Sequence, residues 1–166
     1  MFKVNFKKIL LNFIIILVIF LADRISKIYI LNLVELENVV DVYLMQYLNL
    51  YLIWNKGIAF GLFSFDESFI YNVITLIIIL INIVILAMII KNDGFKKYSL
   101  LLVLGGSLGN LFDRIYYSAV PDFIDLHINQ FHWFIFNVAD IFITMGIICL
   151  IYAEIFFNKG KYDKIN

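Results

Sequence analysis

The chain has 166 residues and no net charge at pH 7, and 63% of its residues are hydrophobic while only 16% are charged. Its mean hydropathy is +0.94, whereas soluble domains contain about 45–50% apolar residues. A soluble fold would lack a wettable surface, and a neutral chain has no overall basic field that attracts nucleic acid. The composition therefore predicts a single integral membrane domain, residues 1–166, with membrane lipids around it and no nucleic-acid partner.

The first predicted membrane span covers about residues 9–30. Three lysines precede this apolar run, a pattern that cleaved signal peptides also show. The stretch IFLADRISK has no small-x-small cleavage site and the helical pattern continues past Asp23, so we interpret the segment as a retained anchor. Asp23 and Lys27 are spaced i, i+4 and can pair on one helix face, most simply as an ion pair at the membrane boundary.

The next region, about residues 36–65, is predicted to form a small extracytoplasmic β-sheet. In VVDVYLMQYLNLYLIWN, tyrosines and aliphatic residues alternate with period two, which favours one or two strands. The apolar side of these strands could face either the bilayer or the helices. Gly57 and Gly61 then permit a tight turn, and Asp66 is the predicted N-cap of the second helix.

The remaining spans are predicted at about residues 69–90, 98–116 and 138–157. The third contains LGGSLGNLFDR, whose glycines let another helix approach closely. Asn110 and Asp113 lie on one helical face, which must contact a polar cavity or other polar groups. Helix packing and a functional site both fit this face. The predicted fold is an all-α membrane protein with four transmembrane helices and the small sheet after the first span.

The distribution of charge predicts the orientation of the spans. Nine of the thirteen Lys and Arg residues lie in segments 1–8, 91–97 and 158–166, and ten of the thirteen acids lie at or beyond the opposite boundary. The positive-inside rule then places both termini in the cytoplasm and the acids on the extracytoplasmic side.

Asp122 follows the third span and Asp140 opens the fourth, so the two carboxylates can meet at the membrane surface. Close carboxylates share a proton, and the pair can then act as base and acid, as in an aspartic peptidase. The residues alone leave other pairings open, because Asp113 and Asp125 are also near.

Three further residues are of types that can bind a metal ion or take part in redox chemistry. His127 and His132 lack the His-x-x-x-His spacing of a zinc site, so we interpret them as solvated or interfacial loop residues. Cys149 is the single cysteine, which excludes an intrachain disulfide, and it is interpreted as a small apolar-facing residue. Neither a metal nor an organic cofactor is predicted.

Five motifs in order resemble those of the lipoprotein signal peptidases (signal peptidase II), a family of four-span bacterial membrane enzymes. They are DRISK (23–27), NKGIAFGLF (55–63), GGSLGNLFDRI (105–115), AVPDFID (119–125) and FNVAD (136–140). Together the five motifs span residues 23–140, so the resemblance covers essentially the whole chain. It implies an aspartic endopeptidase of the bacterial cytoplasmic membrane that cuts a diacylglyceryl-modified prolipoprotein just before the lipidated cysteine.

The resemblance also implies roles for individual residues. Asp122 and Asp140 would be the catalytic dyad. Substrate-binding and supporting roles fall on Asn55, Gly57, Asn110, Arg114, Asn137, Ala139, Asp23, Lys27 and Asp113. Asp125 receives no role and is expected to be a solvated loop acid. The enzyme is expected to act as a monomer on its lipid-modified substrate.

Two other classes of function also fit a small membrane protein with acidic residues. A proton- or ion-coupled transporter would place acids near mid-span, whereas the acids here cluster near one boundary. A noncatalytic assembly factor could pack through the glycines of the third span. Cleavage of a lipidated prolipoprotein peptide separates the enzyme from both.

Overall fold

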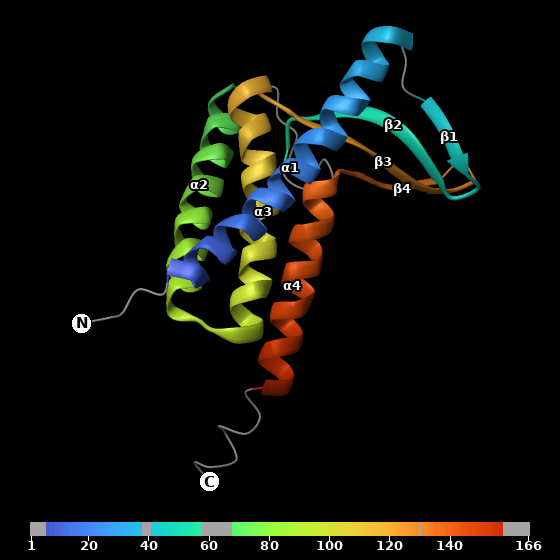
Figure 1. The fold of residues 1–166 in the computed structure, drawn as a ribbon. Helices are drawn as coiled ribbons and strands as arrows, with labels where there is room; N and C mark the ends of the chain where they lie inside the picture. Colours follow the sequence, from blue (N-terminus) through green and yellow to red (C-terminus); the bar gives the residue numbers. More distant parts are fainter. Residues whose placement is uncertain (1–5, 38–40, 58–67, 130, 158–166) are drawn as a thin grey trace.

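The computed structural model describes residues 6–37, 41–57, 68–129 and 131–157. Within these residues, long helices stand beside an antiparallel sheet (Figure 1). The helices are α1 (Phe6–Glu37), α2 (Ser68–Lys91), α3 (Gly94–Tyr117) and α4 (Val138–Phe157). The strands are β1 (Asp41–Met45), β2 (Leu48–Asn55), β3 (Val120–Ile128) and β4 (Phe131–Phe136). The predicted N-cap Asp66 and the predicted turn at Gly61 lie outside the described residues.

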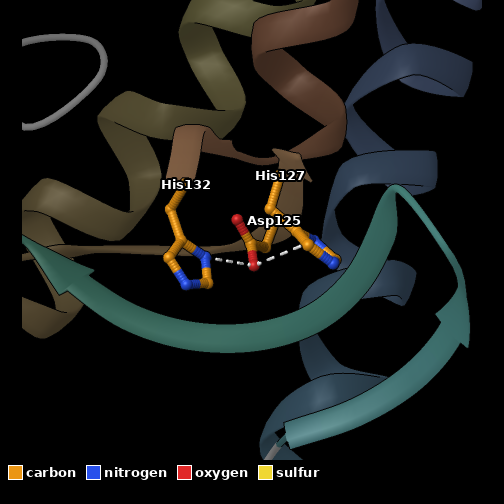
Figure 2. A group of neighbouring side chains, drawn as sticks. All are labelled: Asp125, His127 and His132. Atoms are coloured by element: carbon orange, nitrogen blue, oxygen red, sulfur yellow. Dashed lines mark hydrogen bonds and ion pairs between the residues drawn. The ribbon is translucent and has the colours of Figure 1, made fainter. Parts of the chain in front are cut away.

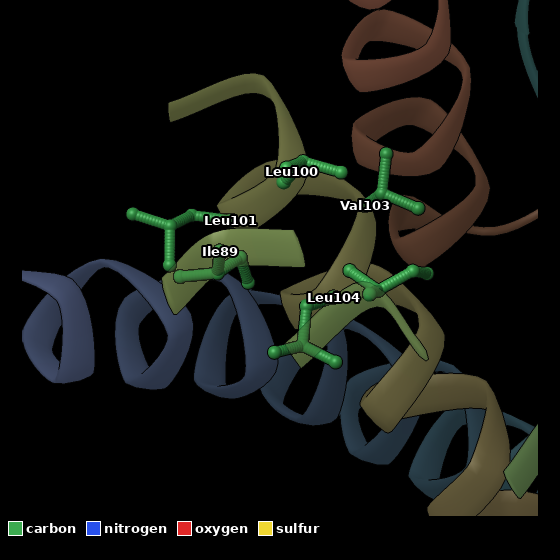
Figure 3. Close-up of a cluster of buried hydrophobic side chains, with 6 residues drawn as sticks. Ile89, Leu100, Leu101, Val103 and Leu104 are labelled. Atoms are coloured by element: carbon green, nitrogen blue, oxygen red, sulfur yellow. The ribbon is translucent and has the colours of Figure 1, made fainter. Parts of the chain in front are cut away.

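Helix α3 is the centre of the helical part, because it packs against α1, α2 and α4. Its glycines allow this: a Cβ on Gly105 would lie 2.9 Å from Ile19 of α1, and one on Gly106 would lie 2.5 Å from the backbone oxygen of Ala139 in α4. The close helix approach predicted from the sequence is therefore present. An apolar cluster that includes Ile89 of α2 and Leu101 of α3 fills the space between these two helices (Figure 3).

Three helical segments of the described chain are long and apolar enough to cross a membrane, by length and composition: Phe6–Leu36, Phe69–Lys91 and Val138–Phe156. Helix α3, which contains the predicted third span, is not among them. Its sequence includes lysines, glycines and the polar residues Asn110, Asp113 and Arg114. These residues suit a helix enclosed by other helices better than one surrounded by lipid.

The sheet is antiparallel with strand order β1-β2-β3-β4. Strands β1 and β2 come from the predicted β region. Strands β3 and β4 come from residues 120–136, between the third and fourth predicted spans, where no strand was predicted, so the sheet extends beyond the predicted β region at about residues 36–65. The missed strand FHWFIF is apolar at nearly every position, and a strand without alternation gives no period-two signal.

The apolar side of the first hairpin faces protein. A buried apolar cluster contains Ile30 of α1 and Phe123 of β3. Val42 of β1 packs against this cluster, as do Leu50 and Leu52 of β2. The hairpins therefore lie against the far part of α1, which extends beyond the predicted boundary at about residue 30. The sheet stands at one end of the helices, while the start of α1, the α2–α3 connection and the end of α4 lie at the other (Figure 1).

Candidate active site

Asp122 is presented by the beginning of β3. Ser118 ends α3 in the left-handed conformation (φ 57°), which turns the chain out of the helix and into the strand. The carboxylate is 1% exposed. Its Oδ1 accepts a hydrogen bond from Asn137 Nδ2 at 2.6 Å, and its Oδ2 accepts one from Asn55 Nδ2 at 2.9 Å. Two amides from two other segments thus fix the orientation of this carboxylate.

Asp140 is held by the first turn of α4. Asn137 Oδ1 accepts a hydrogen bond from the Asp140 backbone N–H at 3.1 Å, and Asp140 Oδ2 accepts one from the Asn137 N–H at 3.1 Å. This reciprocal pair is a capping box with Asp at its third helical position. Asp140 Oδ1 accepts a further hydrogen bond from Asn110 Nδ2 at 2.8 Å. Because Asn137 also binds Asp122, one buried side chain connects the two acids.

Both carboxylates line one cavity of about 250 Å³. Burial, followed by the nearby charge of Asp140, raises the pKa of Asp122 from 3.8 to about 7. A carboxyl group with this pKa is partly protonated at neutral pH and can both give and take a proton. The arrangement can therefore perform acid–base chemistry on a molecule held in the cavity.

Away from the cavity, Lys27 connects α1 to α3. Its ammonium group donates to Asp23 at 2.9 Å, to Asn110 Oδ1 at 2.9 Å and to Asp113 at 2.6 Å, which uses all three of its donors. Asp23 Oδ1 in turn accepts from the Ala139 N–H at 3.1 Å. The predicted Asp23–Lys27 contact is present, but both residues and Asp113 are fully buried in a larger network, which is not the simple boundary ion pair expected from spacing.

Arg114 also lines the cavity and contacts two other segments of the chain. Its Nη2 donates to the backbone oxygen of Gly57, and Tyr71 Oη donates to the backbone oxygen of Arg114 at 3.0 Å. Asn55 Oδ1 accepts from the Gly57 N–H at 2.8 Å, so Gly57 is held between Asn55 and Arg114. The Nε and Nη1 atoms of Arg114 are buried and have no hydrogen-bond partner among the described residues.

A second cavity adjoins the first. It has a volume of about 250 Å³, and its lining is almost entirely apolar. The residues around it are Phe134, Phe136, Asp140, Ile141, Thr144 and Met145. Asp140 and Thr144 also line the first cavity, so Asp140 lies between the two.

Two residue assignments from the sequence are wrong. Asp125 is not a solvated loop acid: it is fully buried in β3, and one of its oxygens lies 2.8 Å from His132 Nδ1. His127 and His132 lie in strands β3 and β4, where they pair directly, and not in a loop, although the His132 side chain is 54% exposed as expected for a solvated residue. These errors follow from the missed hairpin, because strand pairing buries Asp125 and places the two histidines opposite each other.

Sequence reasoning gave no role to two residues that the structure brings into the network. Arg24 is buried and contacts Asp113 at 2.6 Å and Asp23 at 3.0 Å, so Asp113 pairs with α1 and not with its sequence neighbour Arg114. Its position in an apolar helix was the available signal, because a charge there needs a partner. Tyr71 gave no such signal, since tyrosines are common in membrane proteins.

Comparisons with known proteins agree with this arrangement. The sequence profile of the family described as signal peptidase II matches residues 15–156. A protein of Pelagibacter ubique named lipoprotein signal peptidase is 58% identical over 164 residues, which cover 99% of both chains. One with the same name from Anaplasma phagocytophilum is 39% identical over 90% of this chain and 94% of its own.

Solved structures show the same fold. One, described as a bacterial membrane enzyme, superposes with a TM-score of 0.75 at 27% identity and covers 90% of each chain. Another with the same description gives a TM-score of 0.70 at 29% identity over 86% of this chain. The chain belongs to the signal peptidase II family and is a membrane-embedded peptidase.

Proposed function

We propose that the protein removes signal peptides from diacylglyceryl-modified prolipoproteins by cutting just before the lipidated cysteine, with Asp122 and Asp140 as the catalytic dyad. The observation that carries this proposal is the cavity that both carboxylates line. The relatives named lipoprotein signal peptidase support the choice of substrate.

The chemistry follows from a single proton held by the two acids. The ionised carboxylate takes a proton from a water molecule, whose oxygen forms a bond to the scissile carbonyl carbon. The neutral carboxyl group gives its proton to the carbonyl oxygen. When the C–N bond breaks, a proton passes to the leaving nitrogen, which yields a carboxyl end and a free amine. The raised pKa of Asp122 suits this exchange at neutral pH.

The cavity offers contacts for each part of such a substrate. Its polar lining residues include Asn55, Asn110 and Arg114. The buried Nε and Nη1 atoms of Arg114 are donors that we assign to a substrate backbone carbonyl. The cavity is also lined by Ile78, Ile143 and Ile147, which suit the apolar segment of a signal peptide.

The second cavity suits the lipid. Phe134, Phe136, Ile141 and Met145 give it an apolar wall that an acyl chain can cover. Because Asp140 lies between the two cavities, a substrate with its signal peptide in one and its diacylglyceryl group in the other would bring the bond between them to the dyad.

The proposal includes a topology with four transmembrane helices. Helix α3 would cross the membrane enclosed by α1, α2 and α4, which explains its lower hydropathy. Lysines at the start of α1, the end of α2 and the start of α3 lie at one end of the helices, and the sheet lies at the other. By the positive-inside rule, both termini would be cytoplasmic and the dyad would face the extracytoplasmic side of the bacterial inner membrane. The protein would act there as a monomer.

The test is cleavage of a purified diacylglyceryl-modified prolipoprotein by the full chain in a lipid-containing micelle, followed by mass spectrometry. We expect a product that begins with the lipidated cysteine. The unlipidated prolipoprotein is the matched control and should be cut far more slowly. No cleavage of the lipidated substrate by the folded protein would favour a transporter or an assembly factor instead.

A further inference from the structure

Three potential metal ligands converge on the outer half of the β3–β4 hairpin, separate from the dyad. Asp125 and His127 come from β3, and His132 comes from β4 directly opposite His127 (Figure 2). One ligand atom from each of the three lies within 4.8 Å of the others. His132 Nδ1 is 2.8 Å and His127 Nδ1 is 3.6 Å from the same Asp125 oxygen.

These separations fit a small divalent ion. Zinc binds imidazole nitrogen and carboxylate oxygen at about 2.0–2.2 Å, which places tetrahedral ligand atoms about 3.3 Å apart. The two observed distances of 2.8 Å and 3.6 Å lie on either side of that value. Two imidazoles and a carboxylate also form a donor set that zinc uses with a fourth, open position.

A second observation points to a ligand at this place. Asp125 is fully buried, yet its Oδ1 has no hydrogen-bond partner within the described part of the chain. The buried Nδ1 of His127 also has none. Asn49 is the cross-strand partner of Asp125, and its buried Oδ1 is likewise unpartnered among those residues. Directly paired residues of antiparallel strands project from the same face, so Asn49 lies beside the cluster.

Buried polar atoms without a partner destabilise a fold, because they have lost their hydrogen bonds to water. Several of them on one patch, around a carboxylate, would be relieved by a bound cation. We propose that Asp125, His127 and His132 form a binding site for Zn²⁺, with Asn49 or a water molecule at the fourth position.

The site would join the two strands that support the catalytic groups. Asp122 lies on β3 ahead of Asp125, and β4 leads directly into Asn137 and Asp140. A metal ion that bridges β3 and β4 would therefore stabilise the hairpin that positions the dyad. This role does not depend on which substrate the enzyme cuts.

The test exploits the histidine count, since the whole chain contains only two. The full-length protein is prepared without a histidine tag, ¹³C-labelled at histidine, held in detergent and titrated with ZnCl₂. We expect both imidazole signals to shift together and to saturate at one equivalent. Zinc should also raise the melting temperature by about 4 °C, whereas MgCl₂ should change neither signal.

Variants separate this site from the dyad, which could itself attract cations. His132→Gln and His127→Gln should each weaken zinc binding by at least about tenfold, whereas Asp122→Asn should leave the histidine shifts unchanged. The matched control is Asp41→Asn, an exposed acid on strand β1 of the same sheet, which should bind zinc like the unchanged protein.

The proposal is overturned if zinc leaves the two histidine signals unmoved while a pH titration moves them. The cluster would then be only an ion pair of Asp125 with protonated histidine. Equal zinc binding by the His127→Gln and His132→Gln proteins would also overturn it. Because the experiment measures zinc binding and not cleavage, its result does not depend on whether the proposed function is correct.

Discussion

Asn137 contacts both acids of the dyad. Its Oδ1 caps α4 through the Asp140 N–H, and its Nδ2 donates to Asp122. A serine at this position would keep the capping acceptor but would lose the donor, whereas an alanine would lose both. The two functions of Asn137 can therefore be separated experimentally.

We expect Asn137→Ser and Asn137→Ala both to reduce kcat/KM by about 10–100-fold, because each removes the hydrogen bond to Asp122. Asn137→Ser should be more stable than Asn137→Ala by about 1 kcal/mol, the usual worth of an N-cap. Substrate cleavage and thermal melting in detergent measure the two effects. If Asn137→Ser kept full activity, the bond to Asp122 would have no part in catalysis.

Asp122 also predicts how stability depends on pH. Its pKa is about 7 in the folded protein and 3.8 is its ordinary value, so between these values the unfolded chain loses a proton that the native protein keeps. The free energy of unfolding should therefore fall as pH rises from about 4 to 7, by at most about 4 kcal/mol from this group. Below about pH 4, Asp122 is protonated in both the folded and the unfolded chain, so it no longer makes the free energy of unfolding depend on pH.

The measurement compares melting temperatures of the unchanged protein and of Asp122→Asn at pH 4.5 and pH 8. Asparagine does not titrate, so Asp122→Asn should lose less stability between the two pH values. Identical pH dependence in both proteins would show that Asp122 ionises normally. Titrating groups outside the dyad are common to both proteins, so their effects cancel in the comparison, and the difference reports on Asp122 together with its coupled partner Asp140.

The sequence indicated single residues well where a motif or a helical period constrained them. The i, i+4 spacing of Asp23 and Lys27 predicted their contact, which is present at 2.9 Å. Asp125 was misjudged because its burial depends on strand pairing with Asn49, a residue far away in the chain. No local pattern carries that information.

At the scale of the elements, the contact between α3 and the start of α4 sets the position of Asp140. A Cβ on Gly106 would lie 2.5 Å from the backbone oxygen of Ala139, and backbone cannot move aside as a flexible side chain can. Asp140 follows Ala139 directly, so a methyl group at position 106 should push the start of α4 away from Asn110.

We expect Gly106→Ala to lower activity by at least about tenfold and to destabilise the fold by about 1–3 kcal/mol, the usual cost of overpacking. The control is Gly94→Asn at the start of α3, where a Cβ meets nothing within 4 Å and asparagine tolerates the positive φ. Activity and melting temperature of both variants measure the effect. An active, stable Gly106→Ala would mean that this helix contact does not position Asp140.

Helices and strands could be predicted from the sequence where their apolar residues recur with a clear period. Each predicted span lies inside one helix, and the alternating stretch formed β1 and β2. The β3–β4 hairpin was missed because nearly every residue of Phe131–Phe136 is apolar, so this strand shows no period-two pattern. The end of α1 was placed too early because polar residues such as Asn32 and Glu35 obscured the apolar pattern.

For the whole molecule, the arrangement of basic and acidic ends predicts the topology. A thiol or reporter probe at Asn92, in the α2–α3 connection, should report the cytoplasm. A probe at Asn129, in the β3–β4 turn, should report the extracytoplasmic side. Labelling by a membrane-impermeant reagent in intact cells measures the location of both positions. Each variant must be active before it is labelled. The reverse pattern would place the dyad in the wrong compartment for secreted lipoproteins.

The number of spans was the least predictable property of the whole. Composition indicated a membrane protein, but by hydropathy only three of the described helices are candidate spans, and α3, which carries several polar residues, is not one of them. Its packing against α1, α2 and α4 is what a fourth, enclosed span would need, and such packing is not visible in a local window of sequence.

The central claim is that Asp122 and Asp140 act as one catalytic unit, and cleavage of a lipid-modified prolipoprotein by three dyad variants and one control variant tests it most directly. Asp122→Asn and Asp140→Asn should each reduce turnover by about a thousandfold or more, and the double variant should be little worse than either single one. Asp41→Asn, an exposed acid of the same sheet, should retain nearly full activity. Folding is checked by thermal melting. Substantial turnover by a folded Asp122→Asn or Asp140→Asn protein, or a double variant whose loss is the product of the two single losses, would contradict the account.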